Sequence, residues 1–319
     1  TAGTVEVALN GPTFSSDVAR ILYSGNSLYA IGNTDPGGAS GHSSAIGIAK
    51  LDAATGALDE TFGDGSGPLP GTVVIDPELI PDSLDFAYTA ALASNGHILV
   101  GGSAQSGDNS NSAGYLFSVD PDTGSLDSAF GTNGYVLITY DTGVHFDGVS
   151  VTAIKLQADG RILLTGNANH DDEFFNTLTD VLLGSFQPDG TATPGFGTGG
   201  STHVNLGLNT YVTDLVARPN GDLVVSLASN GIIPNPYNSD TLQSIAQFDA
   251  TGAGPTATVS FEYPSLVTPQ GRPTSMLVDS SDRILVAGFR LWNFNFPIPD
   301  SDHTVTRLER DSIFANGFE

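Results

Sequence analysis

Five copies of one pattern follow each other along the 319 residues of the chain. Each copy contains a tight turn rich in Asn, Asp and Gly, with a short apolar run directly after it. The turns are anchored at Asn26, Gly96, Gly160, Gly221 and Asp282, which lie 70, 64, 61 and 61 residues apart. Similarity at a fixed period indicates units that pack on their neighbours. We therefore expect one domain over residues 1–319, built from units at about 17–76, 86–140, 150–207, 211–263 and 272–319 plus 3–9.

Each unit is predicted to contain four β-strands. Before the turn, runs such as Val151–Leu156 alternate, which is the period of a strand with two different faces. After the turn, runs such as Ile98–Val100 and Ile162–Leu164 are continuously apolar, which predicts a strand covered on both faces. Two further strands follow, the second of them after a Phe-Gly pair in the first three units. The 39 Gly and 18 Pro residues are typical of a turn-rich all-β chain.

The fifth unit ends before a fourth strand. At the other end of the chain, Gly3–Leu9 resembles Gly134–Tyr140, the fourth strand of the second unit. This N-terminal strand can complete the last sheet, which would close a ring and remove two exposed sheet edges. The sequence therefore favours an all-β fold, a five-bladed β-propeller of four-stranded antiparallel blades. The alternative is an open array, whose two ends would need atypical caps.

Ala158–Gly166 and Leu126–Gly134 are the clearest copies of a pattern that resembles the delta-60 repeat of exported bacterial β-propeller-like proteins. Unit four departs from that pattern at Ala257–Val259, where Phe-Gly is missing, and unit five has Asp282 in place of Gly. The resemblance implies a fold and export from the cell. It carries no catalytic residues.

The C-terminal tail, Asp311–Glu319, resembles the Ile-Phe-x-x-Gly-Phe-Glu ending of exported gammaproteobacterial proteins. Alternatively, Phe314 fills the core position that Phe130 takes in the second unit. An acidic, lysine-poor composition also suits an exported protein. We therefore expect an extracellular or cell-surface location, with a signal peptide removed.

Charge and composition exclude several classes of function. The chain has 35 acidic and 10 basic residues, a net charge of −25, and this excludes a general nucleic-acid binder. The same balance argues against docking to an anionic membrane. Cysteine is absent, which excludes disulfides and thiolate chemistry. No apolar run has the length of a bilayer-spanning segment, so membrane insertion is not expected.

Long polar loops between the second and third strands of each unit are the expected place for function. The face that carries these loops is also expected to hold His42, His145, His170 and His303 together with several carboxylates. Ca²⁺ is the favoured metal, because carboxylate, amide and backbone oxygens suit it. The candidate ligands are Asp108, Asn109, Asn111, Asp171, Asp172 and Glu173. The alternative is that such side chains only cap turns. Identical melting curves with Ca²⁺ and with EDTA would contradict a calcium site.

Aromatic residues in the same loops are candidates for contact with a glycan or a protein partner. They are Tyr237, Trp292, Phe294 and Phe296. We expect a non-catalytic extracellular binding or assembly module, in which self-assembly would proceed by exchange of the N-terminal strand. The alternative is a secreted glycoside hydrolase or lyase that uses carboxylates of the loop face or the central cavity. No nucleophile elbow or phosphate-binding loop supports other enzyme classes.

Overall fold

The computed structural model describes residues 7, 16–34, 44–63, 65, 67–76, 79–80, 83–107, 111–140, 147–171, 177–206, 209–230, 241–261, 270–292 and 300–308. These residues form antiparallel β-sheets, and no helix occurs among them. Consequently, no helix in the described ranges has the length and apolarity to cross a membrane. The expected all-β, antiparallel class is confirmed.

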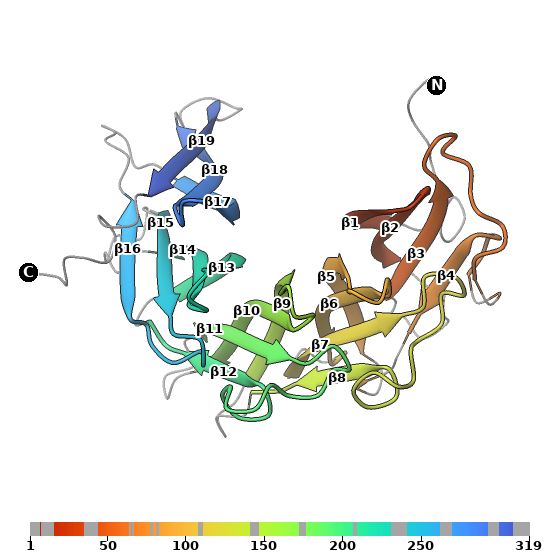
Figure 1. Cartoon of the computed structure of the whole chain (residues 1–319), viewed down its shortest axis with the longest axis horizontal. Helices are drawn as coiled ribbons and strands as arrows, with labels where there is room; N and C mark the ends of the chain where they lie inside the picture. Colours follow the sequence, from red (N-terminus) through yellow and green to blue (C-terminus); the bar gives the residue numbers. More distant parts are fainter. Residues whose placement is uncertain are drawn as a thin grey trace, which may run out of the picture. The chain divides into compact units, whose positions relative to one another are not determined.

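The chain divides into two compact units. The first comprises residues 1–162 and 186–191, and the second comprises residues 163–185 and 192–319. Each unit contains successive repeats of the sequence pattern, which Figure 1 colours along the chain. The boundary falls within the third repeat.

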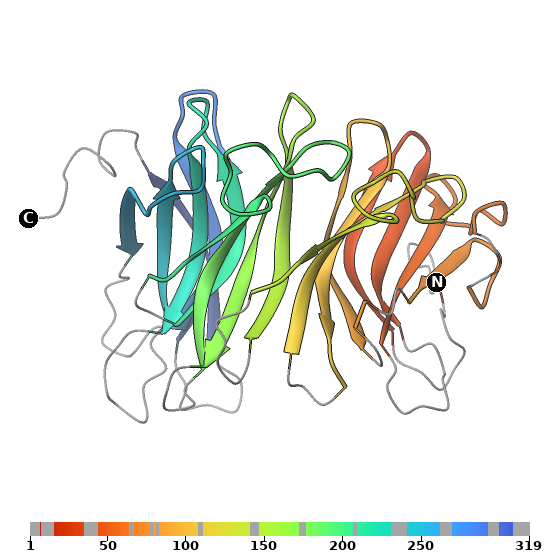
Figure 2. The same cartoon turned by 90° about the horizontal axis from the view of Figure 1, so that it is seen from below.

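The first unit contains two four-stranded arrangements and one further strand. The first sheet has the order β1-β2-β3-β4, with β1 at Ser16–Ser24, β2 at Ser27–Thr34, β3 at Ala45–Asp52 and β4 at Thr72–Ile75. The second repeat adds β5 at Leu84–Leu92, β6 at Ile98–Gln105, β7 at Asn111–Val119 and β8 at Tyr135–Ile138, each paired with the next. In Figure 2 the strands of the first sheet, in red and orange, run side by side. β9, at Asp147–Leu156, meets the start of β7 in a short parallel pairing.

The second unit continues the pattern. The rest of the third repeat supplies β10 at Ile162–Asp171, β11 at Thr177–Phe186 and β12 at Ser201–Val204, and β11 pairs with β12. A four-stranded sheet follows, with β13 at Asn209–Ala217, β14 at Leu223–Asn230, β15 at Thr241–Phe248 and β16 at Ala257–Phe261. The last described sheet has β17 at Gln270–Val278, β18 at Ile284–Trp292 and β19 at Asp300–Leu308.

The continuously apolar second and third strands form the cores. In the first unit, Ile31 and Ile48 belong to the same buried cluster as Val100 and Phe117. The second unit has two buried core clusters, one around Phe248 and one around Met276 and Ile284 of the last repeat. Neighbouring sheets thus bury the strands that the sequence predicted to be covered on both faces.

The first strand of four repeats contains a β-bulge at a matching position. The register shifts between Val18 and Arg20 in β1, and between Ala87 and Thr89 in β5. It shifts likewise in β13 and β17. A bulge places one extra residue in the strand and re-aims a side chain. The strict period of two that the sequence predicts for these strands is therefore interrupted at one point.

The N-terminal strand expected over Gly3–Leu9 lies outside the described residues, apart from Val7. Val7 packs against Ala49 and Leu51 in the first sheet. The last sheet has three strands among the described residues, β17, β18 and β19. The described sheets therefore do not show a closed ring of five blades, and closure stays a prediction.

Candidate functional site

Most of the contact and metal residues predicted from the sequence lie outside the described residues. These are Asp108, Asn109, Asp172, Glu173, Tyr237, Phe294 and Phe296. Trp292 ends β18 and pairs with Asp300, and Asn111 begins β7. Asp171 ends β10, where its carboxylate accepts a hydrogen bond from Thr177 Oγ1 at 2.9 Å. Across the described ranges no group of three His, Asp or Glu side chains is arranged to hold a metal ion. The calcium site stays a prediction.

Turn aspartates in several repeats act as caps. Asp120 Oδ1 accepts hydrogen bonds from the backbone N–H groups of Asp122 and Thr123 at 2.9 and 2.8 Å. Asp189 and Asp249 accept bonds from the threonine two residues further on. Such bonds to the charged form lower the pKa of these carboxyl groups. Their oxygens are occupied within their own turns, which is a structural role.

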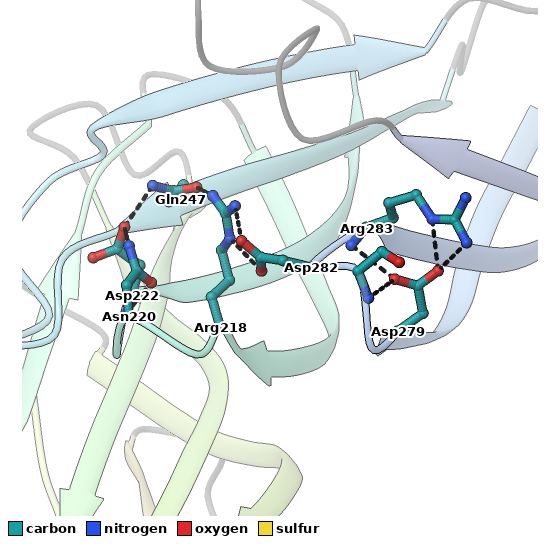
Figure 3. A network of polar contacts seen from close by, with 8 residues as sticks. Arg218, Asn220, Asp222, Gln247, Asp279, Asp282 and Arg283 are labelled. Carbon is teal, nitrogen blue, oxygen red and sulfur yellow. Dashed lines mark hydrogen bonds and ion pairs between the residues drawn. The ribbon is translucent and has the colours of Figure 1, made fainter.

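A network of polar contacts joins the fourth and fifth repeats in the second unit (Figure 3). Arg218 is buried, and its guanidinium donates two hydrogen bonds to Asp282, at 3.1 and 2.6 Å. It also donates to Gln247 Oε1, whose amide nitrogen donates to Asp222. Because every group in this network has a protein partner, we assign the network to the stability of the unit and not to a ligand.

The ring of Tyr88 is the exposed part of an ordered aromatic pair in β5. Tyr88 is 38% exposed, although its neighbours Ala87 and Thr89 are buried. Its ring lies nearly parallel to that of Phe86, with 7° between the planes and 6.2 Å between the centroids. Ser103 Oγ on β6 donates a hydrogen bond to the Tyr88 hydroxyl at 3.2 Å. We call Phe86, Tyr88 and Ser103 the Tyr88 platform.

Buried groups hold this platform from beneath. The Tyr115 hydroxyl donates a 2.6 Å hydrogen bond to the carbonyl oxygen of Phe86. This approach needs Gly102, because a Cβ there would collide with the Phe86 carbonyl and the Tyr115 hydroxyl. Burial, and secondarily the carboxylate of Asp85, raises the pKa of Tyr115 well above its usual value, so the hydroxyl keeps its proton. The backbone under the platform is thus fixed before any ligand arrives.

A second polar cluster lies in the third repeat, within the second unit. Nδ1 of His170 is 3.8 Å from a carboxylate oxygen of Asp180, and Asn205 donates to the other oxygen at 2.7 Å. Burial lowers the pKa of His203, while the charge of Asp180 opposes the shift. Nδ1 of His170 and Nε2 of His203 are both buried. Those atoms offer no proton-transfer surface to a polymeric substrate in solvent.

The Tyr88 platform was not among the site residues predicted from the sequence. Aromatic contacts were expected from the loops and not from the first strands. A signal was present, because Phe86 and Tyr88 are spaced two residues apart in a strand. The burial of β5 follows this spacing, with Phe86 and Tyr88 on its less buried side.

Comparisons with known proteins give likeness of fold only. No family model matches the chain, and no curated protein matches it. One similar solved structure is a polysaccharide lyase, an ulvan lyase bound to -[GlcA(1-4)Rha3S]-, with 12% identity and a TM-score of 0.56 over 89% of this chain. The chain spans 64% of that lyase. This likeness supports a propeller-like fold.

Two further solved structures show weaker likeness. The polysaccharide lyase Uly1 has 9% identity and a TM-score of 0.46, over 88% of this chain and 55% of that one. An endo-arabinase from Bacteroides thetaiotaomicron has 10% identity and a TM-score of 0.41, over 95% of this chain and 99% of that one.

Proposed function

We propose that this protein is an extracellular glycan-binding module without catalytic activity. The observation that carries the proposal is the exposed ring of Tyr88, which lies parallel to the ring of Phe86 and accepts a hydrogen bond from Ser103. The apolar C–H face of a sugar can lie on such a ring, while the tyrosine hydroxyl serves as a polar handle. A ring that is already ordered loses little conformational entropy on binding. The fold likeness to a lyase bound to a glycan agrees with this proposal.

The test is to replace the platform residue and measure affinity for oligosaccharides by calorimetry. Tyr88→Ala is expected to weaken binding at least tenfold, since central aromatic residues carry much of the energy at such contacts. Tyr88→Phe keeps the ring and is expected to change affinity by less than about threefold, the scale of one modest hydrogen bond.

The matched control is Leu137→Ala, which removes an exposed apolar side chain on β8 of the same repeat. It is expected to leave affinity unchanged, and melting curves check that all variants fold. If Tyr88→Ala binds like the native protein, the contact lies elsewhere, for example in the loops that hold Tyr237 and Trp292. If no glycan binds the native protein, the proposed function itself is wrong.

The alternative, a secreted glycoside hydrolase or lyase, is an outcome of the same experiment. Release of new reducing or unsaturated ends during incubation with polysaccharides would establish it. In that case the residues to mutate are those of the second polar cluster, His170, Asp180 and His203, although Nδ1 of His170 and Nε2 of His203 are buried. Extracellular or surface location follows from the acidic, lysine-poor composition, and fractionation of producing cells checks it.

We also propose that the chain closes as a five-bladed ring, with residues 3–9 completing the last sheet. Apolar side chains on the terminal sheets support closure. Ile21 and Tyr23 on β1, and Leu277 and Val305 in the last sheet, are all more than half exposed. Soluble proteins seldom leave such faces uncovered. Exchange of the N-terminal strand between copies is the competing arrangement, which size-exclusion mass would reveal as a polymer.

A further inference from the structure

Resting on the proposed function, we infer that the Tyr88 platform selects uncharged glycans and rejects uronate and sulfated ones. The ulvan lyase of similar fold holds -[GlcA(1-4)Rha3S]-, in which a carboxylate and a sulfate are present. The charges of this chain, over the whole molecule and at the platform, do not favour such an anionic ligand.

Overall charge opposes an anionic ligand. With 35 acidic and 10 basic residues, the net charge is −25, so a polyanion is repelled as it approaches. Recognition of a uronate or a sulfate would then require basic side chains gathered at the site, since charge-assisted hydrogen bonds are the strong contacts to such groups.

In the first unit, a lysine and an arginine are already engaged with carboxylates. Lys50 is buried, 3.4 Å from Asp59 and 3.5 Å from Asp122. Its ammonium group also lies over the rings of Tyr29 and Phe62. Arg161 Nε lies 2.7 Å from its own turn aspartate, Asp159. These cations stabilise turns and repeats, and using them for a ligand would break those pairs.

The second unit uses its buried arginine in the same way. Arg218 binds Asp282 and Gln247. Arg283 bonds through Nε to Asp279, which is four residues earlier. These four cations, two in each unit, are therefore engaged with carboxylates of the chain itself, while Arg20 on β1 donates a hydrogen bond to the backbone carbonyl of Ala19.

The platform itself presents neutral groups. Phe86, Tyr88 and Ser103 carry no charge at neutral pH, and Ser103 donates a hydrogen bond to the Tyr88 hydroxyl. These residues therefore offer an anionic sugar no charged partner, whereas a sugar hydroxyl can accept a hydrogen bond from the Tyr88 hydroxyl.

The test is electrophoresis of the intact protein through gels that contain a polysaccharide, at low and at high salt. One set holds uncharged polymers, namely glucan, mannan and arabinan, and the other holds polygalacturonate and a sulfated galactan. We expect retardation by at least one uncharged polymer, with a dissociation constant that changes less than about twofold with salt, because no charge is paired. Retardation by an anionic polymer that weakens as salt rises would overturn the inference.

A charge variant sharpens this test. Leu84 lies two residues before Phe86 in β5, on the same side of the strand, and is half-buried. Leu84→Lys is expected to gain salt-sensitive binding to polygalacturonate, while the neutral control Leu84→Gln gains none. If the lysine variant gains no such binding, charge is not what excludes anionic sugars, and the inference is wrong.

The inference and the proposed function fail in different ways. If neither set of polymers retards the native protein, or if Tyr88→Ala is retarded as strongly as the native protein, the proposed glycan site fails. If Tyr88-dependent binding is found but favours the anionic polymers, the site stands and only the ligand class is wrong.

Discussion

Asp282 shows how one residue can depart from a repeat for a physical reason. Gly96, Gly160 and Gly221 occupy the matching turn position, with φ between 84° and 93°. Asp282 also has a positive φ, 60°, which disfavours residues with a Cβ, although Asp tolerates it better than most. Its carboxylate binds the buried guanidinium of Arg218. The interaction offsets the backbone cost and joins two repeats.

Asp282→Gly separates these two effects. Relief of the left-handed conformation alone would stabilise the protein by about 1 kcal/mol. Removing one partner of a buried ion pair costs about 3–5 kcal/mol. We therefore expect a net loss of about 2–4 kcal/mol in the free energy of unfolding, measured with urea. The double variant Arg218→Met with Asp282→Gly is expected to recover much of the loss, because no buried charge is then left unpaired. A stabilised Asp282→Gly protein would contradict this account.

At the scale of elements, the sequence predicts the strands well and their irregularities poorly. The apolar run Ile98–Val100 is fully buried, as its pattern indicates. The Phe-Gly positions are equally clear, since Phe62 and Phe130 are core residues. The β-bulge between Ala87 and Thr89 was missed, because the alternating residue pattern predicts a strand without an extra residue. Of the predicted loop contacts, Tyr237, Phe294 and Phe296 lie outside the described ranges, whereas Trp292 is the last residue of β18.

The turns between strands respond to acid. Hydrogen bonds from Arg283, first from its side chain and then from its backbone, lower the pKa of Asp279 from 3.8 to about 2. The turn aspartates Asp52, Asp120, Asp189 and Asp249 have pKa values lowered in the same direction by their own turn bonds. A carboxyl group with a lower pKa in the folded state stabilises folding above the unfolded pKa.

This stabilisation is lost as the pH falls below about 4 and through the folded pKa of about 2. The melting temperature of the native protein should therefore fall steeply over that range. Asp279→Asn should melt at a lower temperature than the native protein at pH 7. Its melting temperature should also fall less between pH 4 and pH 2, because the variant lacks one carboxyl group with a lowered pKa. Parallel slopes for the two proteins, measured by circular dichroism, would show that this turn does not contribute to acid sensitivity.

At the scale of the whole molecule, the apolar faces of the first and last sheets distinguish a closed ring from an open array. Ile21 is 65% exposed on β1, and Val305 is 73% exposed on β19. The five-bladed ring proposed above buries both side chains, and an open array leaves both in water. The two arrangements therefore predict opposite responses to a charge placed at these positions.

Ile21→Lys and Val305→Lys test closure. If the faces are covered in solution, each variant buries an unpaired ammonium group and should lower the free energy of unfolding by more than about 2 kcal/mol. If they are open, each should change it by no more than about 0.5 kcal/mol, as surface substitutions do. Leu137→Lys on β8, at a position 43% exposed, is the control and should be near neutral in both cases. If the native protein is a monomer and both lysine variants are destabilised, the result supports a ring within one chain. Strand exchange between copies would instead give the native protein a larger mass, and the variants would have a smaller mass.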